Sequence, residues 1–123
     1  MTRYYWKKQD DNNSCGQLAV SIIVKKPVKE IYKLLKGYKS YTNAKIIIAL
    51  LRYYGIRCDS NLQFTRKSDL AICKLTDTKD KNGYYHFIVI WKDKIFDGAN
   101  GYRNGTVRWE KHWKITSYIN IYQ

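Results

Sequence analysis

Apolar residues recur at helical spacing in the first half of the chain and gather in shorter β-branched and aromatic runs in the second half. The first apolar run is hydrophobic on nearly all sides, which is typical of a buried central helix, and Lys25-Lys26-Pro27 ends it. A later helical stripe has Thr42 as its candidate N-cap and Gly55 as its C-terminal cap. The pattern predicts three helices, over residues 15–24, 28–36 and 43–54.

The second half of the chain changes to a strand pattern. Two of its apolar segments are separated by a tight connection near Asp93, which predicts a β-hairpin. We expect a loop over 97–101 and a single helical turn over 109–113. The pattern predicts strands over 69–76, 84–91, 94–97 and 115–122. Helices followed by an antiparallel sheet indicate the α+β class, and the length of the chain favours a single domain over 1–123.

The chemistry-bearing stretch lies just before the central helix. Ser14 is a good N-cap and Gln17, three residues later, can complete a capping box, so Cys15 falls in the first turn. The positive end of a helix favours an anion, and a neighbouring imidazolium would lower the pKa of this thiol further, to about 3.5–7.5 from roughly 8.5. Gly16 leaves room for a substrate carbonyl. The Cys15 backbone N–H and the Gln9 amide are then candidate donors to an oxyanion.

A nucleophilic thiolate needs a base within hydrogen-bond reach and a third group that orients the base. The chain has two histidines. His86 stands at the start of a predicted strand, and we prefer it as the base; His112, in the sequence Trp-Glu-Lys-His-Trp, is the rival.

The candidate orienting group, Asp97, lies on the returning arm of the hairpin. Side chains alternate between the two faces of a sheet. Asp97 therefore shares a face with His86 only if, in each pair of residues facing one another across the hairpin, the two residue numbers add up to an odd value. Pairing Trp91 with Lys94 meets that condition. With an even sum, Asn100 would be the better orienting group.

The remaining candidate ligands do not indicate a metal or a cofactor. The three cysteines are an odd number without a CxxC pair, which argues against a disulfide framework and a zinc ribbon. We expect Cys58 and Cys73 to be core thiols. The polar residues 10–13 include two acidic side chains but no further ligands nearby, so we expect no metal there.

The chain carries a formal net charge of +13, which would concentrate anionic partners such as nucleic acid or an acidic protein. The Lys-, Ile-, Tyr- and Asn-rich composition is equally typical of an AT-rich phage or bacterial genome. No run approaches the roughly 18 apolar residues of a membrane span, and the amino-terminal residues do not resemble a signal peptide. We therefore expect a cytoplasmic protein with free thiols.

These motifs together resemble the papain-like cysteine peptidases. The shared features are a Gln six residues before Cys-Gly at a helix start, His-Phe-Ile-Val-Ile on a strand, and a hairpin return to Asp-Gly. The chain is particularly similar to the peptidase domains that cleave double-glycine leader peptides for bacteriocin exporters, and to their stand-alone relatives. The resemblance covers most of the chain and implies a papain-like fold. It implies Cys15 as nucleophile, His86 as general base, Asp97 as orienting acid and Gln9 as oxyanion donor.

Two functions follow as expectations. The first is a small cysteine peptidase that hydrolyses a peptide or isopeptide bond in a peptide or protein substrate; the same residues would also support acyl transfer or deamidation. The alternative is a catalytically idle, peptidase-like binding protein whose basic surface recognises nucleic acid or an acidic protein.

Overall fold

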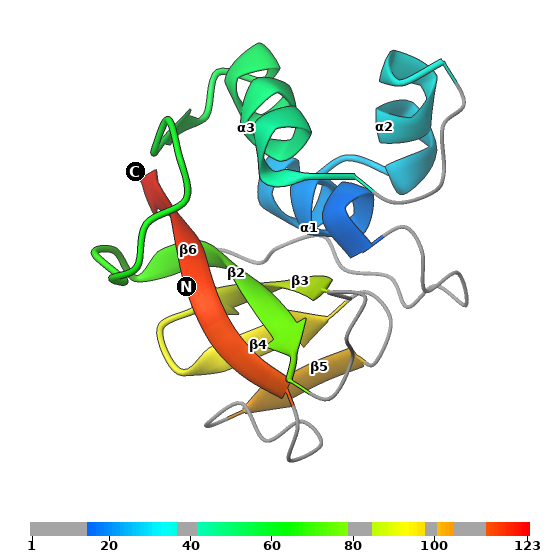
Figure 1. The fold of residues 1–123 in the computed structure, drawn as a ribbon. Helices are drawn as coiled ribbons and strands as arrows, with labels where there is room; N and C mark the ends of the chain where they lie inside the picture. Colours follow the sequence, from blue (N-terminus) through cyan, green and yellow to red (C-terminus); the bar gives the residue numbers. More distant parts are fainter. Residues whose placement is uncertain (1–14, 37–41, 79–84, 98–100, 105–112) are drawn as a thin grey trace.

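The computed structural model describes residues 15–36, 42–78, 85–97, 101–104 and 113–123, with the backbone alone at 77, 97, 101–104 and 113. Within these ranges three helices precede six strands (Figure 1). The helices are α1 (Cys15–Val24), α2 (Val28–Leu34) and α3 (Ala44–Tyr53). The strands are β1 (Arg57–Cys58), β2 (Leu70–Asp77), β3 (Tyr85–Trp91), β4 (Lys94–Asp97), β5 (Gly101–Asn104) and β6 (Trp113–Tyr122).

The central helix has the bounds that the sequence predicts. Nine of its ten residues are buried, consistent with an apolar surface on nearly all sides. Lys25 follows the helix in the left-handed conformation, with φ of 60°, and the Lys26 N–H donates to the Ser21 carbonyl over 3.2 Å. This bond and the following Pro27 end the helix as predicted.

The N-cap of α3 is Asn43, so the prediction of Thr42 is wrong by one residue. The Asn43 side chain accepts a hydrogen bond from the Ile46 N–H over 2.9 Å. Thr42 is instead buried beneath the start of α1. Gly55, with φ of +76°, follows the helix in the left-handed region, as expected of a C-terminal glycine.

The six strands form one antiparallel sheet in the order β1-β6-β2-β3-β4-β5. The predicted hairpin is β3–β4, and its register pairs Trp91 with Lys94 and Val89 with Phe96, as the odd-sum condition requires. The sequence reasoning missed β1 and β5. Of the loop expected over 97–101, Asp97 ends β4 and Gly101 begins β5, while 98–100 lie outside the described residues. The predicted helical turn at 109–113 lies outside the described residues except for Trp113, where β6 begins.

The helices lie together on one side of the sheet (Figure 1). The larger core joins α1 and α3 to the residues of the sheet that point toward them, among them Leu70, Ile72, Phe87, Val89, Trp91, Phe96, Ile119 and Ile121. A second cluster occupies the opposite face of the sheet and contains Cys73, Leu75, Ile88, Ile90 and Ile95. Helices packed against an antiparallel sheet place the fold in the α+β class. No helix in the described part of the chain is long and apolar enough to cross a membrane.

Candidate functional site

Cys15 is the first residue of α1, and only 5% of its surface is exposed. Its neighbours in the larger core come from the helices and from the face of the sheet that the helices cover. The first backbone N–H groups of any α-helix have no partner within the helix, so the Cys15 thiol lies at the end where an anion is favoured. The predicted N-cap Ser14 and the predicted oxyanion donor Gln9 lie outside the described residues.

Thr42 connects the start of α1 to the start of β3. A Cβ atom added to Gly16 would overlap Cγ2 of Thr42, so the two residues are in close contact. The Thr42 carbonyl in turn accepts a hydrogen bond from the Tyr85 hydroxyl over 2.5 Å. The residue after Cys15 and the residue before His86 therefore contact the same threonine.

The alternation of β3 decides which way its side chains point. Tyr85 packs against the larger core and its ring contacts that of Phe87 edge-on, with 5.4 Å between the ring centroids. Both residues therefore face the helices. His86 lies between them and is paired with Leu75, which belongs to the cluster on the opposite face. Alternation thus assigns the half-buried His86 to the face of the sheet that the helices leave uncovered.

These observations limit how the side chains of Cys15 and His86 could approach one another. α1 packs against β3 and β4, and the segments that carry Cys15 and His86 lie at the same end of the molecule. Because the two side chains belong to opposite faces, they can meet only around the end of β3, where His86 is the second residue. The β3–β4 register fulfils the odd-sum condition for Asp97. The side chain of Asp97, and the rivals Asn100 and His112, lie outside what the structure describes.

The other two cysteines have the environments of unreactive thiols. Cys73 is fully buried in the second cluster, and burial raises the pKa of its thiol to about 12. Cys58 is half-buried at the edge strand β1. Burial raises its pKa as well, and this outweighs the opposing hydrogen bond and positive charge of Arg52. Both thiols are protonated at neutral pH, so neither is an activated nucleophile.

Among the residues described, no group of three His, Cys, Asp or Glu side chains is arranged to hold a metal ion. The acidic residues in 10–13 fall outside those ranges. No protein-family profile matches the chain, and no curated protein is significantly similar to it.

The sequence reasoning missed the role of Thr42. A threonine next to an asparagine before an apolar stripe indicates an N-cap at either position, so the local pattern contained the right motif. The close approach to Gly16 depends on how α1 and α3 pack, and no pattern within either segment reveals it.

Proposed function

We propose that the protein is a small cysteine peptidase in which Cys15 is the nucleophile and His86 the general base. The observation that carries the proposal is the contact made through Thr42, which holds the residue after Cys15 and the residue before His86 at one end of the molecule. Cys15 is also the first residue of a buried helix, where the free backbone N–H groups can donate to an oxyanion that forms beside the sulfur.

The proposed reaction has two halves. The Cys15 thiolate attacks the carbonyl carbon of the scissile bond, and the oxyanion is stabilised by the Cys15 N–H together with the amide of Gln9. Protonated His86 gives its proton to the leaving amine, and a thioester remains on Cys15. His86 then removes a proton from water, the hydroxide attacks the thioester, and the acid product leaves while the thiolate is regenerated. Asp97 would orient the imidazole.

The order in which the three thiols react with iodoacetamide tests this proposal. Burial alone predicts that half-buried Cys58 reacts first, since Cys15 is 5% exposed and Cys73 is fully buried. An activated thiolate at a substrate cleft reverses that order, so we expect Cys15 to be alkylated at least tenfold faster than Cys58 at neutral pH. Peptide mapping by mass spectrometry measures all three rates in one sample.

Paired histidine variants sharpen the test. If His86 is the base, His86→Ala slows the alkylation of Cys15 near neutral pH, whereas His112→Ala leaves it unchanged. Cys15→Ala should abolish labelling by an electrophilic peptide probe library and keep the circular dichroism spectrum of the folded protein. Preferential alkylation of Cys58, with Cys15 unaffected by either histidine variant, would refute the peptidase.

One observation favours a second function. Cys15 is buried in the larger core and alternation turns His86 toward the opposite face, as expected of a scaffold that no longer catalyses. The protein would then bind nucleic acid or an acidic protein through its net charge of +13. Oligonucleotide binding that weakens steeply with salt and does not change in Cys15→Ala would support this function.

A further inference from the structure

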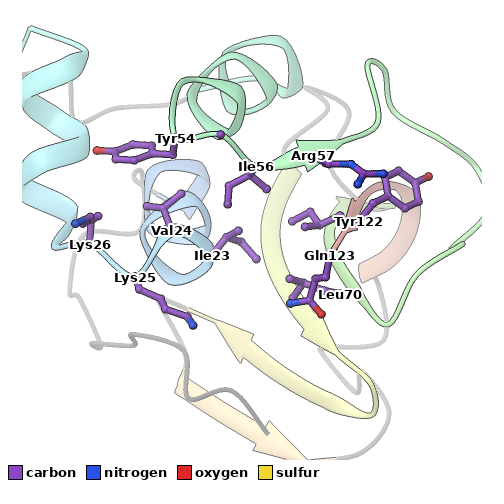
Figure 2. Close-up of a pocket in the computed structure, with 12 residues that line it drawn as sticks. Ile23, Val24, Lys25, Lys26, Tyr54, Ile56, Arg57, Leu70, Tyr122 and Gln123 are labelled. Carbon is purple, nitrogen blue, oxygen red and sulfur yellow. The ribbon is translucent and has the colours of Figure 1, made fainter.

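A groove lies at the opposite end of α1 from Cys15. It is a hollow of about 470 Å³ between the C-terminal ends of α1 and α3 and the end of β6 (Figure 2). A helix rises about 1.5 Å per residue, so the ten residues of α1 place the groove roughly 15 Å from the thiol. The volume is within the range of natural ligand pockets.

The floor of the groove is apolar. Ile23, Leu70 and Ile121 each belong to the larger core, and half-buried Val24 and Ile56 pack against that core. The core of the protein therefore reaches the surface here between two helix ends. An apolar group that entered the groove would leave water and contact aliphatic side chains, which is favourable by about 25 cal/mol for each Å² buried.

The rim is basic on two sides. Lys25 and Lys26 follow α1 on one side, and Arg57 in β1 lies on the other (Figure 2). All three side chains are exposed, and no aspartate or glutamate is among the residues that line the hollow. The groove therefore combines an apolar floor with positive charge at both margins.

Two tyrosines in the lining donate hydrogen bonds to carboxylates that are not themselves part of the lining. The Tyr54 hydroxyl donates to Glu30 and the Tyr122 hydroxyl donates to Asp59, each over 2.6 Å. Burial, together with Glu30, raises the pKa of Tyr54 to about 12, and the bond to Asp59 raises that of Tyr122. Both phenols are therefore neutral in the physiological range and add no negative charge to the groove.

The rim is also built on fixed backbone. The Lys26 N–H bonds to the Ser21 carbonyl, and the Ile56 N–H bonds to the Leu51 carbonyl over 2.9 Å. These bonds close the ends of α1 and α3, so the backbone that carries the cations on each margin is ordered before a ligand arrives. A preformed site loses less conformational entropy on binding than one that must be ordered.

We propose that this groove binds an acidic peptide segment that carries one large apolar side chain. The apolar side chain would rest on Ile23 and Ile56, and acidic residues on either side of it would meet Lys26 and Arg57. A fatty acid has its charge at one end and would satisfy one margin only, whereas a peptide can carry charge on both sides of its apolar group. The inference does not depend on the chemistry of Cys15.

The test is fluorescence anisotropy with a fluorescein-labelled peptide in which a central leucine stands between two pairs of glutamates. We expect Lys26→Glu with Arg57→Glu to weaken binding roughly tenfold or more, because both margins then repel the peptide. The matched control, Lys45→Glu with Lys114→Glu, makes the same change of net charge at exposed positions outside the groove and should change binding less than about twofold. Replacing the leucine of the peptide by serine should lower its affinity for the natural protein roughly tenfold.

Three results would overturn the proposal. Equal losses in the two charge-reversed proteins would mean that only net charge attracts the peptide, and equal binding of the serine peptide would mean that the floor is not used. Binding of decanoate or a short oligothymidylate, with the peptide inactive, would assign the groove to another ligand class. Should the double variant fold poorly by circular dichroism, Lys26→Gln and Arg57→Gln singly provide the same comparison, each expected to weaken binding.

Discussion

Thr42 occupies the space that any side chain on Gly16 would need. The position of an added Cβ overlaps Cγ2 of Thr42 and lies 3.1 Å from Cδ1 of Ile47, closer than ordinary packing allows. The packing of α1 against the start of α3 therefore favours a glycine after Cys15, independently of any role of the thiol. The same threonine accepts the hydrogen bond from Tyr85.

We expect Gly16→Ala to lower the free energy of unfolding by about 1–2 kcal/mol, because overpacking outweighs the better helix propensity of alanine. Adding Thr42→Ser removes Cγ2, keeps the hydroxyl and the backbone carbonyl, and should restore most of the loss. Urea denaturation of the two single variants and the double variant gives the coupling energy. Losses that simply add would show that the two residues are not in contact.

Local signals were enough to predict much of the fold. The apolar run that begins at Cys15 predicts the start of α1, and Lys25-Lys26-Pro27 predicts that the helix ends at Val24. Gly55 ends α3 because a residue without a Cβ adopts the left-handed conformation at little cost. The hairpin follows from two β-branched runs separated by two residues, a separation that leaves little freedom of register.

Long-range packing explains what the sequence could not predict. Both alternating sets of β3 are apolar apart from His86, so periodicity cannot decide which set the helices cover. The structure shows that Phe87 and Val89 face α1 while Ile88 faces away. The strand β1 is two residues long and has no period to detect, and it forms only because Arg57 and Cys58 meet the end of β6.

Lys36 is a second site where stability can be measured. It follows α2 with φ of 55°, a left-handed conformation that costs an L-residue roughly 1 kcal/mol and costs glycine almost nothing. We expect Lys36→Gly to raise the free energy of unfolding by about 0.5–1 kcal/mol. The matched control Lys33→Gly, within α2, should lower it by about 1 kcal/mol. Thermal denaturation followed by circular dichroism compares the two, and a loss of stability in Lys36→Gly would contradict the argument.

Phe64 and Phe87 carry the same side chain in opposite environments. Phe64 is 90% exposed, although the preceding Gln63 is bonded to Tyr118 in both directions, over 2.8 and 2.7 Å. Phe87 is fully buried. We expect Phe64→Ala to change the free energy of unfolding by less than about 0.5 kcal/mol and Phe87→Ala to lower it by about 3–5 kcal/mol. Comparable losses in urea denaturation would mean that Phe64 packs against another part of the chain.

Asp59 joins the loop after β1 to the last strand. Its carboxylate accepts hydrogen bonds from the backbone N–H and side-chain amide of Asn120, each over 2.8 Å, and from the Tyr122 hydroxyl. Asn120 is fully buried, and its amide also binds the Thr65 carbonyl and the Lys67 N–H. Burial alone would raise the pKa of Asp59, but these hydrogen bonds and the charge of Lys67 outweigh it and leave the pKa below its ordinary value.

A carboxyl whose pKa is lowered by folding stabilises the protein above its unfolded value, near 3.9, and this contribution is lost as the pH falls through the lower folded value. We therefore expect the urea midpoint of the natural protein to fall as the pH drops below about 4. The free energy of unfolding of Asp59→Asn should be about 1 kcal/mol lower at pH 7 and should depend less on pH below about pH 4. Asp69→Asn, which removes an exposed carboxylate that makes none of these hydrogen bonds, serves as the control for the loss of one negative charge. If Asp59→Asn kept the acid dependence of the natural protein, the lowered pKa would have to belong to another carboxyl group.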